Sequence, residues 1–235
     1  MNMAVSGFST ALIVGTGSGL SAALARAFAG AGMKLALGAR RVDKLAALCA
    51  ETGAQAFACD ATQRSDVERL FAGVDDRIGP PDVVVFNASY RVRGPFVDLD
   101  ATEVERTLMV SALGGFLVAQ AAARRMVPRR HGAILFTGAS ASTKGYPQSA
   151  PFAMAKFALR GLAQSLAREL SPQGVHVAHF VIDGGIRSGT RAAASDAPDS
   201  LLDPDAIADS YLHLIDQPRT SWSWEIEVRP WLERF

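Results

Sequence analysis

Six short apolar runs alternate with longer segments of helical period, and this alternation limits the possible folds more than any other feature of the sequence. The runs are rich in Val, Ile, Leu and Ala, as expected of strands that are buried on both faces. Strands that alternate with helices form parallel sheets through right-handed crossovers. The sequence therefore predicts one α/β domain over residues 1–235, with a doubly wound parallel sheet of about seven strands and helices on both faces.

The boundaries of the expected elements follow from the same pattern. Strands are expected at Ala11–Val14, Leu35–Leu37, Ala54–Ala58, Val83–Phe86, Ala133–Phe136 and Val177–Ile182, with an edge strand at Trp222–Val228. Helices are expected at Leu20–Ala29, Val42–Glu51, Ser65–Val74, Ala101–Met126, Pro151–Leu170 and Pro204–Ile215. The segment Ile186–Ser200 is expected to be a loop, either a lid over a cleft or a linker.

Composition narrows the class of protein. Apolar residues make up 49% of the chain and the formal net charge is +1, which favours a packed core and argues against a nucleic-acid partner. One basic cluster stands out, and it is expected at a helix end, where cations interact favourably with the helix dipole. The cluster comprises Arg124, Arg125, Arg129, Arg130 and His131.

Other sequence features concern the cellular setting. Two cysteines, Cys49 and Cys59, cannot form a disulfide framework, so we expect a reducing, cytoplasmic location. The N-terminal residues do not resemble a signal peptide, and no apolar run is expected to span a membrane. The spacing of His176 and His179 on one strand does not suit a metal site, and we expect no metal.

A glycine-rich turn follows the first expected strand and opens the first expected helix. Gly15, Gly17, Ser18, Gly19 and Leu20 are its candidate ligand-binding residues. Glycines allow a pyrophosphate to approach the amides at a helix N-terminus, so this context predicts a Rossmann-type dinucleotide site. Two registers fit: one with Gly17 and Gly19 as the paired glycines, and one that begins at Gly15 and places Ser21 at the last glycine position.

Two arginines stand at the end of the second expected strand. Proteins that prefer NAD usually carry an acid there, which binds the ribose hydroxyls. Arg40 and Arg41 offer guanidinium groups instead, and these suit the 2′-phosphate of NADP(H). We therefore expect NADP(H) to be preferred over NAD(H); surface charge without a ligand is the alternative.

Further segments resemble the short-chain dehydrogenase/reductase superfamily over nearly the whole chain. Asp60-Ala61 is similar to the family's adenine-contacting motif, and Asn87-Ala88-Ser89 resembles its Asn-Asn-Ala-Gly motif. His176–Ile186 resembles the family's last core strand and Pro-Gly loop, with Asp183-Gly184 at the Pro-Gly position. The resemblance implies cofactor contacts from Asp60, Ala61, Asn87, Ala88, Ser89, Gly185, Ile186 and Ser188.

The same resemblance implies an altered catalytic set. Phe152-Ala-Met-Ala-Lys156 is similar to the family's Tyr-x-x-x-Lys helix, so Phe152 replaces the tyrosine while Lys156 is retained as a ribose ligand. Ala139 falls at the catalytic serine, with Ser140 beside it, and Ser111 falls at the asparagine. Phenylalanine has no proton to donate, so cofactor binding is expected to persist while ordinary acid–base catalysis is not.

Three functions remain open on these residues. The first is an atypical NADP(H)-dependent oxidoreductase that acts on a small carbonyl, imine or enone, with Lys156, Ser111, Ser140 and Tyr90 as candidate catalytic residues and Tyr146 or a water as other proton sources. The second is a catalytically silent NADP(H)-binding sensor or assembly protein. The third is a structural protein that has lost the cofactor. By resemblance, the helices Ala101–Met126 and Pro151–Leu170 also imply a homodimer or homotetramer.

Overall fold

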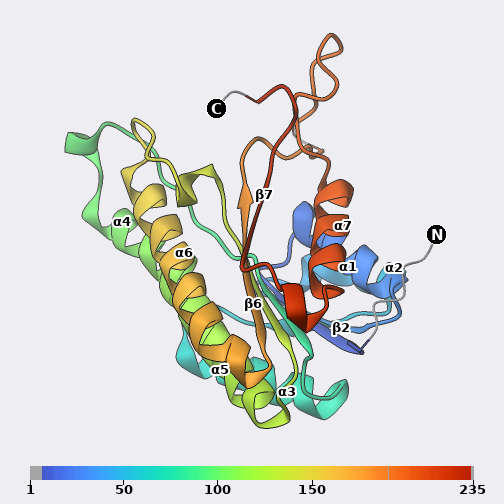
Figure 1. The fold of residues 1–235 in the computed structure, drawn as a ribbon. Coiled ribbons are helices and arrows are strands. Elements are labelled where there is room, and N and C mark those ends of the chain that lie inside the picture. The colour runs from blue at the N-terminus through green and yellow to red at the C-terminus, as the bar shows by residue number, and fades with distance from the viewer. Residues whose placement is uncertain (1–6, 190, 234–235) are drawn as a thin grey trace.

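The structure is a computed structural model that describes residues 7–189 and 191–233. The seven strands form one sheet in the order β3-β2-β1-β4-β5-β6-β7, and every neighbouring pair is parallel. Helices cover both faces of this sheet (Figure 1). The predicted doubly wound α/β fold is confirmed. Residues 1–6, on which part of the signal-peptide expectation rests, lie outside the described residues.

The elements lie close to their predicted positions. The strands are β1 (Thr10–Val14), β2 (Lys34–Ala39), β3 (Gln55–Ala58), β4 (Val83–Phe86), β5 (Ala133–Thr137), β6 (His176–Ile182) and β7 (Glu225–Val228). The helices are α1 (Leu20–Gly30), α2 (Ala46–Thr52), α3 (Arg64–Arg77), α4 (Ala101–Leu108), α5 (Gly114–Arg129), α6 (Ala150–Leu170) and α7 (Pro204–Ile215).

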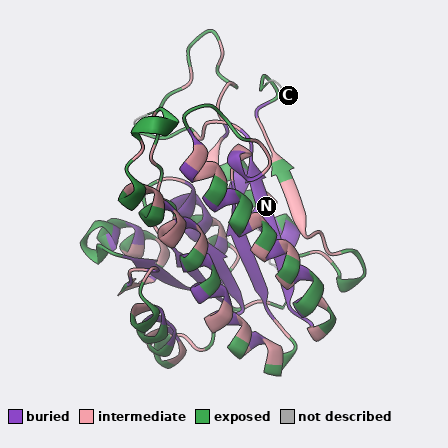
Figure 2. Cartoon of the chain, turned by 90° about the vertical axis from the view of Figure 1, so that its left-hand side faces the viewer, coloured by how far each residue is buried: buried purple, intermediate pink, exposed green. Residues whose placement is uncertain are grey.

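Strand residues alternate between two cores, one on each face of the sheet. In β1, Ala11 and Ile13 pack with α1 and α7, whereas Leu12 and Val14 pack with α3, α5 and α6. Successive side chains of a strand point to opposite faces, so a strand buried on both sides is apolar throughout. Figure 2 shows the resulting layers, with buried strands between helices whose outer surfaces are exposed.

The helical stretch from Ala101 to Arg129 differs from its prediction as one regular helix. A π-helical turn, Met109–Leu113, separates α4 from α5 and holds the buried Ser111. By length and composition this stretch could cross a membrane, contrary to the expectation that no run is long enough, although half of its most apolar window is buried inside the protein. A core helix of a soluble protein passes the same test.

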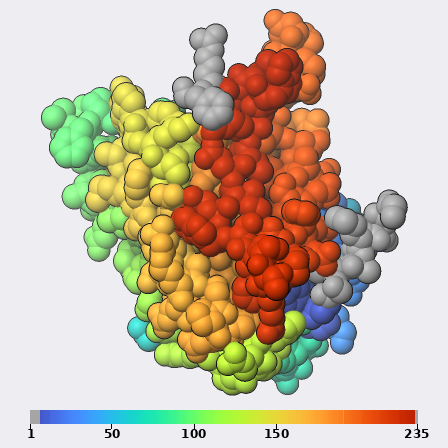
Figure 3. Space-filling model, viewed as in Figure 1, coloured from blue at the N-terminus to red at the C-terminus, as the bar shows by residue number. Residues whose placement is uncertain are grey.

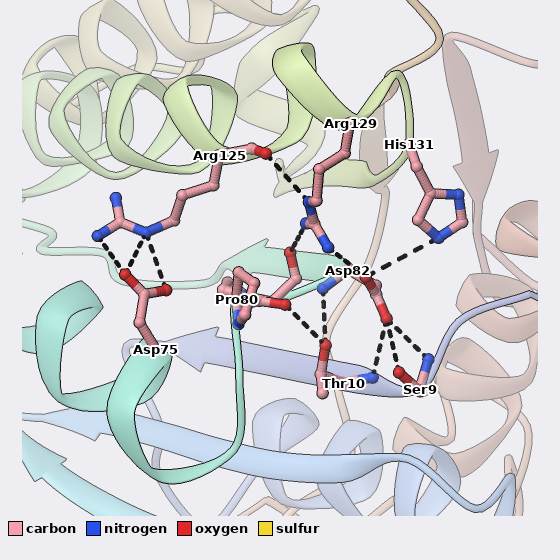
Figure 4. A network of polar contacts seen from close by, with 9 residues as sticks. Ser9, Thr10, Asp75, Pro80, Asp82, Arg125, Arg129 and His131 are labelled. Atoms are coloured by element: carbon pink, nitrogen blue, oxygen red, sulfur yellow. Dashed lines mark hydrogen bonds and ion pairs between the residues drawn. The ribbon is translucent and has the colours of Figure 1, made fainter.

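A network of polar contacts joins β1, β4 and the end of α5 at the amino-terminal edge of the sheet (Figure 4). The carboxylate of Asp82 accepts hydrogen bonds from the backbone and hydroxyl of Ser9, both at 2.9 Å, and from the backbone of Thr10. Arg129 forms an ion pair with Asp82 at 2.9 Å. The basic cluster therefore lies at a helix end, as predicted, and two of its arginines, Arg125 and Arg129, have carboxylate partners.

The opposite edge of the sheet carries the long loops. In Figure 3, the loop before α6 (yellow) and the loop after β6 (orange) stand at the upper end of the molecule, on either side of the C-terminal segment (red). This edge contains the carboxyl ends of the strands, and the strand order reverses between β1 and β4. Ligands of open α/β sheets bind at such a reversal.

Candidate functional site

Three adjoining hollows follow the carboxyl ends of the strands. The central hollow lies at β1, β3 and β4, and the basic hollow lies beside it at β2 and α2. The distal hollow lies at β4, β5 and β6. Thr16 and Arg40 line both the central and the basic hollow, whereas Asn87 lines both the central and the distal hollow. The hollows therefore form one elongated site.

Gly15 makes the close backbone approach at the middle of this site. Its φ angle is +88°, and a Cβ atom there would lie 2.3 Å from the backbone nitrogen of Ala88. The side chain of Asn87 donates a hydrogen bond to the carbonyl of Gly15 at 3.3 Å. Only glycine fits such a position without moving the neighbouring loop. The register that begins at Gly15 is therefore the one that fits this geometry.

The turn after Gly15 leads into the N-terminus of α1. Gly19 caps the helix, has no side chain and makes no side-chain capping bond. Ser21, at the last glycine position of this register, is 2% exposed. Its Oγ accepts a hydrogen bond from the Gly17 amide at 2.8 Å, so the serine stabilises the turn from inside. The helix N-terminus thus presents backbone amides toward an anion site.

The basic hollow has positive charge at its rim. Arg40, Arg41 and Lys44 line it and are exposed. Within residues 7–189 and 191–233, Arg40 and Arg41 have no carboxylate partner, whereas the other arginine of this hollow, Arg26, pairs with Glu51 at 2.7 Å. This end of the site can therefore hold a phosphate group.

The central hollow contains five further residues that are expected to contact a cofactor. Ala61, Ala88 and Ser89 line it together with Asp60 and Asn87. The carboxylate of Asp60 accepts hydrogen bonds from the amide of Thr62 at 3.0 Å and from its hydroxyl at 2.8 Å. These bonds fix the turn after β3 and keep the wall of the hollow in place.

Lys156 lies behind the wall of the distal hollow. Its side chain is buried at 3% exposure, and its Nζ donates to the carbonyl oxygen of Thr137 at 2.8 Å. Thr137 itself lines the distal hollow. Burial lowers the pKa of Lys156 from 10.5 to about 8, because a charged amine is destabilised away from water. This amine can therefore exchange a proton near neutral pH.

Phe152 stands one helical turn before Lys156, and two cations approach its ring. The ring centroid lies 5.7 Å from Lys156 Nζ and 4.9 Å from the guanidinium carbon of Arg91. Phenylalanine offers these cations only its ring face, and it holds no exchangeable proton. Among the described residues that line the distal hollow, Ala139 is present and Ser140 is not.

Ser111 and Tyr90 bind each other. The hydroxyl of Ser111 is fully buried and accepts a hydrogen bond from the Tyr90 amide at 2.9 Å. The phenol of Tyr90 donates to Glu103, which raises the pKa of Tyr90, and Arg106 lies 4.2 Å from the ring centroid. Neither residue is among those that line the distal hollow. Their contacts order the loop after β4.

The loop after β6 forms another wall of the distal hollow. Gly184, Ile186 and Ser188 line it, whereas the carbonyl of Gly185 accepts a hydrogen bond from the amide of Leu202 at 2.8 Å. The buried carboxylate of Asp183 accepts a hydrogen bond from Lys144 at 2.9 Å. Sequence reasoning placed Ile186 and Ser188 at the site but did not select Gly184, Thr137 or Arg191.

The buried His179 contacts a partly exposed ion pair. His179 Nδ1 contacts Glu225 at 3.1 Å, and Glu225 also pairs with Arg160 at 2.6 Å. Burial lowers the pKa of His179 to about 4, which keeps the ring neutral. Over residues 7–189 and 191–233, no group of three His, Cys, Asp or Glu side chains could hold a metal ion.

The residues fit a dinucleotide. The Gly15 cradle would be filled by any Cβ atom, the amides of α1 have no side-chain cap, and the basic hollow adds two arginines without acid partners. Together these groups can accept the pyrophosphate and a further phosphate of one extended ligand.

Comparisons with known proteins agree on one family. The family model described as short chain dehydrogenase matches residues 9–199. A short-chain dehydrogenase/reductase of Armillaria gallica is 34% identical over 179 residues, covering 72% of this chain and 68% of that protein. A short-chain dehydrogenase from Rhodopseudomonas palustris superimposes with a TM-score of 0.83 at 33% identity, over 95% of this chain and 99% of the other. An alcohol dehydrogenase from Thermococcus sibiricus, complexed with 5-hydroxy-NADP, has a TM-score of 0.84 at 27% identity, over 96% and 98%.

Proposed function

The chain belongs to the short-chain dehydrogenase family, and on that premise we propose that it is an NADP(H)-dependent oxidoreductase of a small carbonyl, imine or enone. The family binds a nicotinamide cofactor and acts on small molecules. The observation that carries the choice of NADP(H) is the pair Arg40 and Arg41 at the end of β2, where no acid stands. An NADP analogue bound to the related archaeal alcohol dehydrogenase supports it.

The cofactor would lie along the three hollows. The amides at the start of α1 would bind the pyrophosphate, and Arg40 would bind the 2′-phosphate in the basic hollow. Asp60 and Ala61 would contact the adenine. Asn87, which lines both the central and the distal hollow, would lie where the cofactor passes from one to the other. When bound, the nicotinamide supplies or accepts a hydride.

Lys156 would hold and move the proton of the reaction. Phe152 has no proton, and Ala139 has no hydroxyl with which to polarise a carbonyl. An amine with a pKa of about 8 is mostly protonated at neutral pH and still acidic enough to donate, either directly or through a water. Thr137 positions this amine through its carbonyl oxygen. Imines suit the site because an iminium ion needs no acid when the hydride arrives.

A binding titration tests the cofactor choice. We expect the protein to bind NADPH at least about tenfold more tightly than NADH, because a charge-assisted hydrogen bond contributes about 1.5–3 kcal/mol. Arg40→Ser should weaken NADPH binding and leave NADH binding nearly unchanged. Arg64→Ser, at the start of α3 and outside the three hollows, is the matched control. Tighter binding of NADH by the unmodified protein would reject the preference.

Turnover needs its own assay. NADPH oxidation is measured with a panel of aldehydes, ketones, cyclic imines and enones. Turnover of any class at a rate that depends on Lys156 supports the proposal. Firm NADPH binding with no turnover across the whole panel would contradict it and leave a silent cofactor-binding protein.

Helices α5 and α6, which contain most of the two segments expected to form subunit contacts, carry exposed apolar side chains. Phe116 on α5 is 39% exposed, and Met154 and Phe157 on α6 are 51% and 45% exposed. Such side chains suit an interface between identical subunits, so a homodimer or homotetramer is part of the proposal. Sedimentation of the purified protein tests it, and Phe157→Glu should shift the assembly toward the monomer. The two free cysteines suit a cytoplasmic location.

A further inference from the structure

Three arginines lie on two loops that follow β4 and β6, and one of the three lines the distal hollow. Arg91 and Arg93 lie in the loop between β4 and α4, and Arg191 lies in the loop after β6 and lines the hollow. Partial burial lowers the pKa of the Arg91 guanidinium, and the like charges of Arg93 and Arg191 lower it further. Loops that are far apart in the sequence therefore bring like charges together at one place.

Other basic residues near this edge have acidic partners. Lys144 pairs with Asp183 at 2.9 Å, and Arg187 pairs with Asp203 at 2.6 Å. Within the described ranges 7–189 and 191–233, none of Arg91, Arg93 and Arg191 has an ion pair with a carboxylate. Neighbouring guanidinium groups repel one another, and an anion between them relieves that repulsion.

Arg91 also marks the position where substrate chemistry is expected. Its guanidinium carbon lies 4.9 Å from the centroid of the Phe152 ring, one helical turn from Lys156. A planar guanidinium on an aromatic face keeps its outer N–H groups available for a carboxylate or phosphate. The basic hollow lies at the other end of the site, so the phosphate proposed for Arg40 does not account for these three charges.

We propose that Arg91, Arg93 and Arg191 form an anion-binding wall of the distal hollow and that the substrate carries a carboxylate or phosphate group. This inference rests on the proposed oxidoreductase function, for which it names the substrate class. The anionic group is bound by the arginines, which leaves the reacting carbonyl, imine or alkene near Lys156.

Binding without turnover provides the test. Calorimetric titrations use the protein saturated with NADP⁺ and two matched pairs of aldehydes. One pair is 4-carboxybenzaldehyde and 4-formylbenzamide; the other is 4-formylphenyl phosphate and 4-hydroxybenzaldehyde. We expect the anionic member of at least one pair to bind about tenfold more tightly than its neutral partner, and the pair that shows it identifies carboxylate or phosphate.

Substitutions assign the effect to the wall. Arg91→Gln, at a residue outside the lining of the three hollows, should remove most of the preference for the anion while leaving the affinity for NADPH unchanged. Arg191→Gln should also remove most of the preference. Arg168→Gln, on the exposed side of α6, is the matched control and should keep the preference. Equal affinity for the anionic and neutral members, or no binding of either, would overturn the inference.

Two further outcomes separate this inference from the proposed function. Loss of NADPH affinity in Arg91→Gln would overturn the wall, because the arginines would then serve the cofactor. Anion binding that depends on Arg91, combined with no NADPH oxidation for any panel substrate, would support the wall while contradicting the oxidoreductase.

Discussion

The two ends of the candidate site, the central and basic hollows on one side and the distal hollow on the other, differ in the groups that form them. At the central and basic hollows, the binding groups are backbone amides, a glycine turn and arginines at the end of β2. At the distal hollow the proposed chemistry depends on individual side chains. Ala139, which lines that hollow, and Phe152, one helical turn before Lys156, stand where the resemblance implies a serine and a tyrosine. Almost any residue supplies a backbone amide, whereas a catalytic hydroxyl is lost by one substitution. A chain can therefore keep its cofactor site while its catalytic site diverges.

The largest effect is expected at Gly15 in the central hollow, where the backbone leaves no room for a side chain. Gly15→Val introduces a Cβ atom 2.3 Å from the Ala88 nitrogen at a φ of +88°. NADPH binding should be abolished, and the free energy of unfolding should fall by about 2–4 kcal/mol. Calorimetry and urea denaturation measure the two effects. Gly17→Ala, where a Cβ atom meets nothing within 4 Å, should fold normally. Equal effects at the two glycines would contradict the cradle.

Lys156→Met should lower the rate of catalysis and at the same time raise the stability of the fold. Turnover should fall by about 10²–10⁴-fold, the usual contribution of acid–base help. The free energy of unfolding at pH 7 should rise by up to about 3 kcal/mol, because the variant no longer buries a charged amine on folding. Methionine reaches as far as the Cε atom of lysine and lacks the amine, with a thioether sulfur in place of one methylene.

The pH dependence of this effect has a defined sign. The folded-state pKa of Lys156, about 8, lies below its ordinary value of 10.5. As the pH falls from 10.5 to about 8, the unfolded chain takes up a proton that the folded chain does not, so the native protein loses stability relative to Lys156→Met. The rate of substrate reduction should fall as the pH rises through about 8. A rate that stays constant from pH 7 to pH 9 would exclude Lys156 as the proton donor.

Phe152→Tyr should restore the Tyr-x-x-x-Lys pair that the family resemblance implies. A tyrosine one helical turn before Lys156 supplies the missing proton donor, so we expect carbonyl reduction to rise by about tenfold or more. NADPH oxidation with an aldehyde measures this gain. Phe157→Tyr, on the exposed face of the same helix, should change nothing. Unchanged or reduced activity in Phe152→Tyr would contradict the view that a missing hydroxyl at position 152 limits the native reaction.

The smallest effect is expected inside the glycine turn. Ser21→Ala removes the hydrogen bond that the Gly17 amide donates to Ser21 Oγ, at a cost of about 1 kcal/mol. NADPH affinity should fall by about two- to fivefold as the turn loosens. Ser165→Ala, at an exposed position of α6, provides the control in the same titration. Unchanged affinity in Ser21→Ala would show that the backbone alone maintains the turn.

Sequence patterns predicted the fold because apolar periodicity reports burial directly. The run Leu35–Leu37 became β2, which extends to Ala39, and the same logic found every other strand of the sheet. The π-helical turn at Met109–Leu113 escaped prediction because the apolar period continues through it. The backbone hydrogen bonds of a few residues determine where a π-helical turn forms, and the pattern of apolar side chains hardly depends on it.

The site was predictable where backbone requirements select residue types. Gly15 was selected because a turn of this kind needs glycine, and Arg40 because it follows a strand beside that turn; both line the proposed site. Thr137 was missed because it binds Lys156 through its carbonyl, which every residue possesses. Arg91 and Arg191 come from loops about a hundred residues apart, and only the folded structure shows that their charges interact.

The Asp82 network has a consequence for the order in which the sheet assembles. Ser9 and Asp82 are 73 positions apart, and β2 and β3 lie between them in the chain although they pair on the other side of β1. Asp82 therefore reaches Ser9 only after β4 has been synthesised and has returned to the open edge of β1. Arg129 completes the contacts later still, once α5 is present. On the ribosome, this network can therefore close only after the chain has been synthesised as far as Arg129, so β1 forms its contacts with Asp82 long after β1 itself has been made.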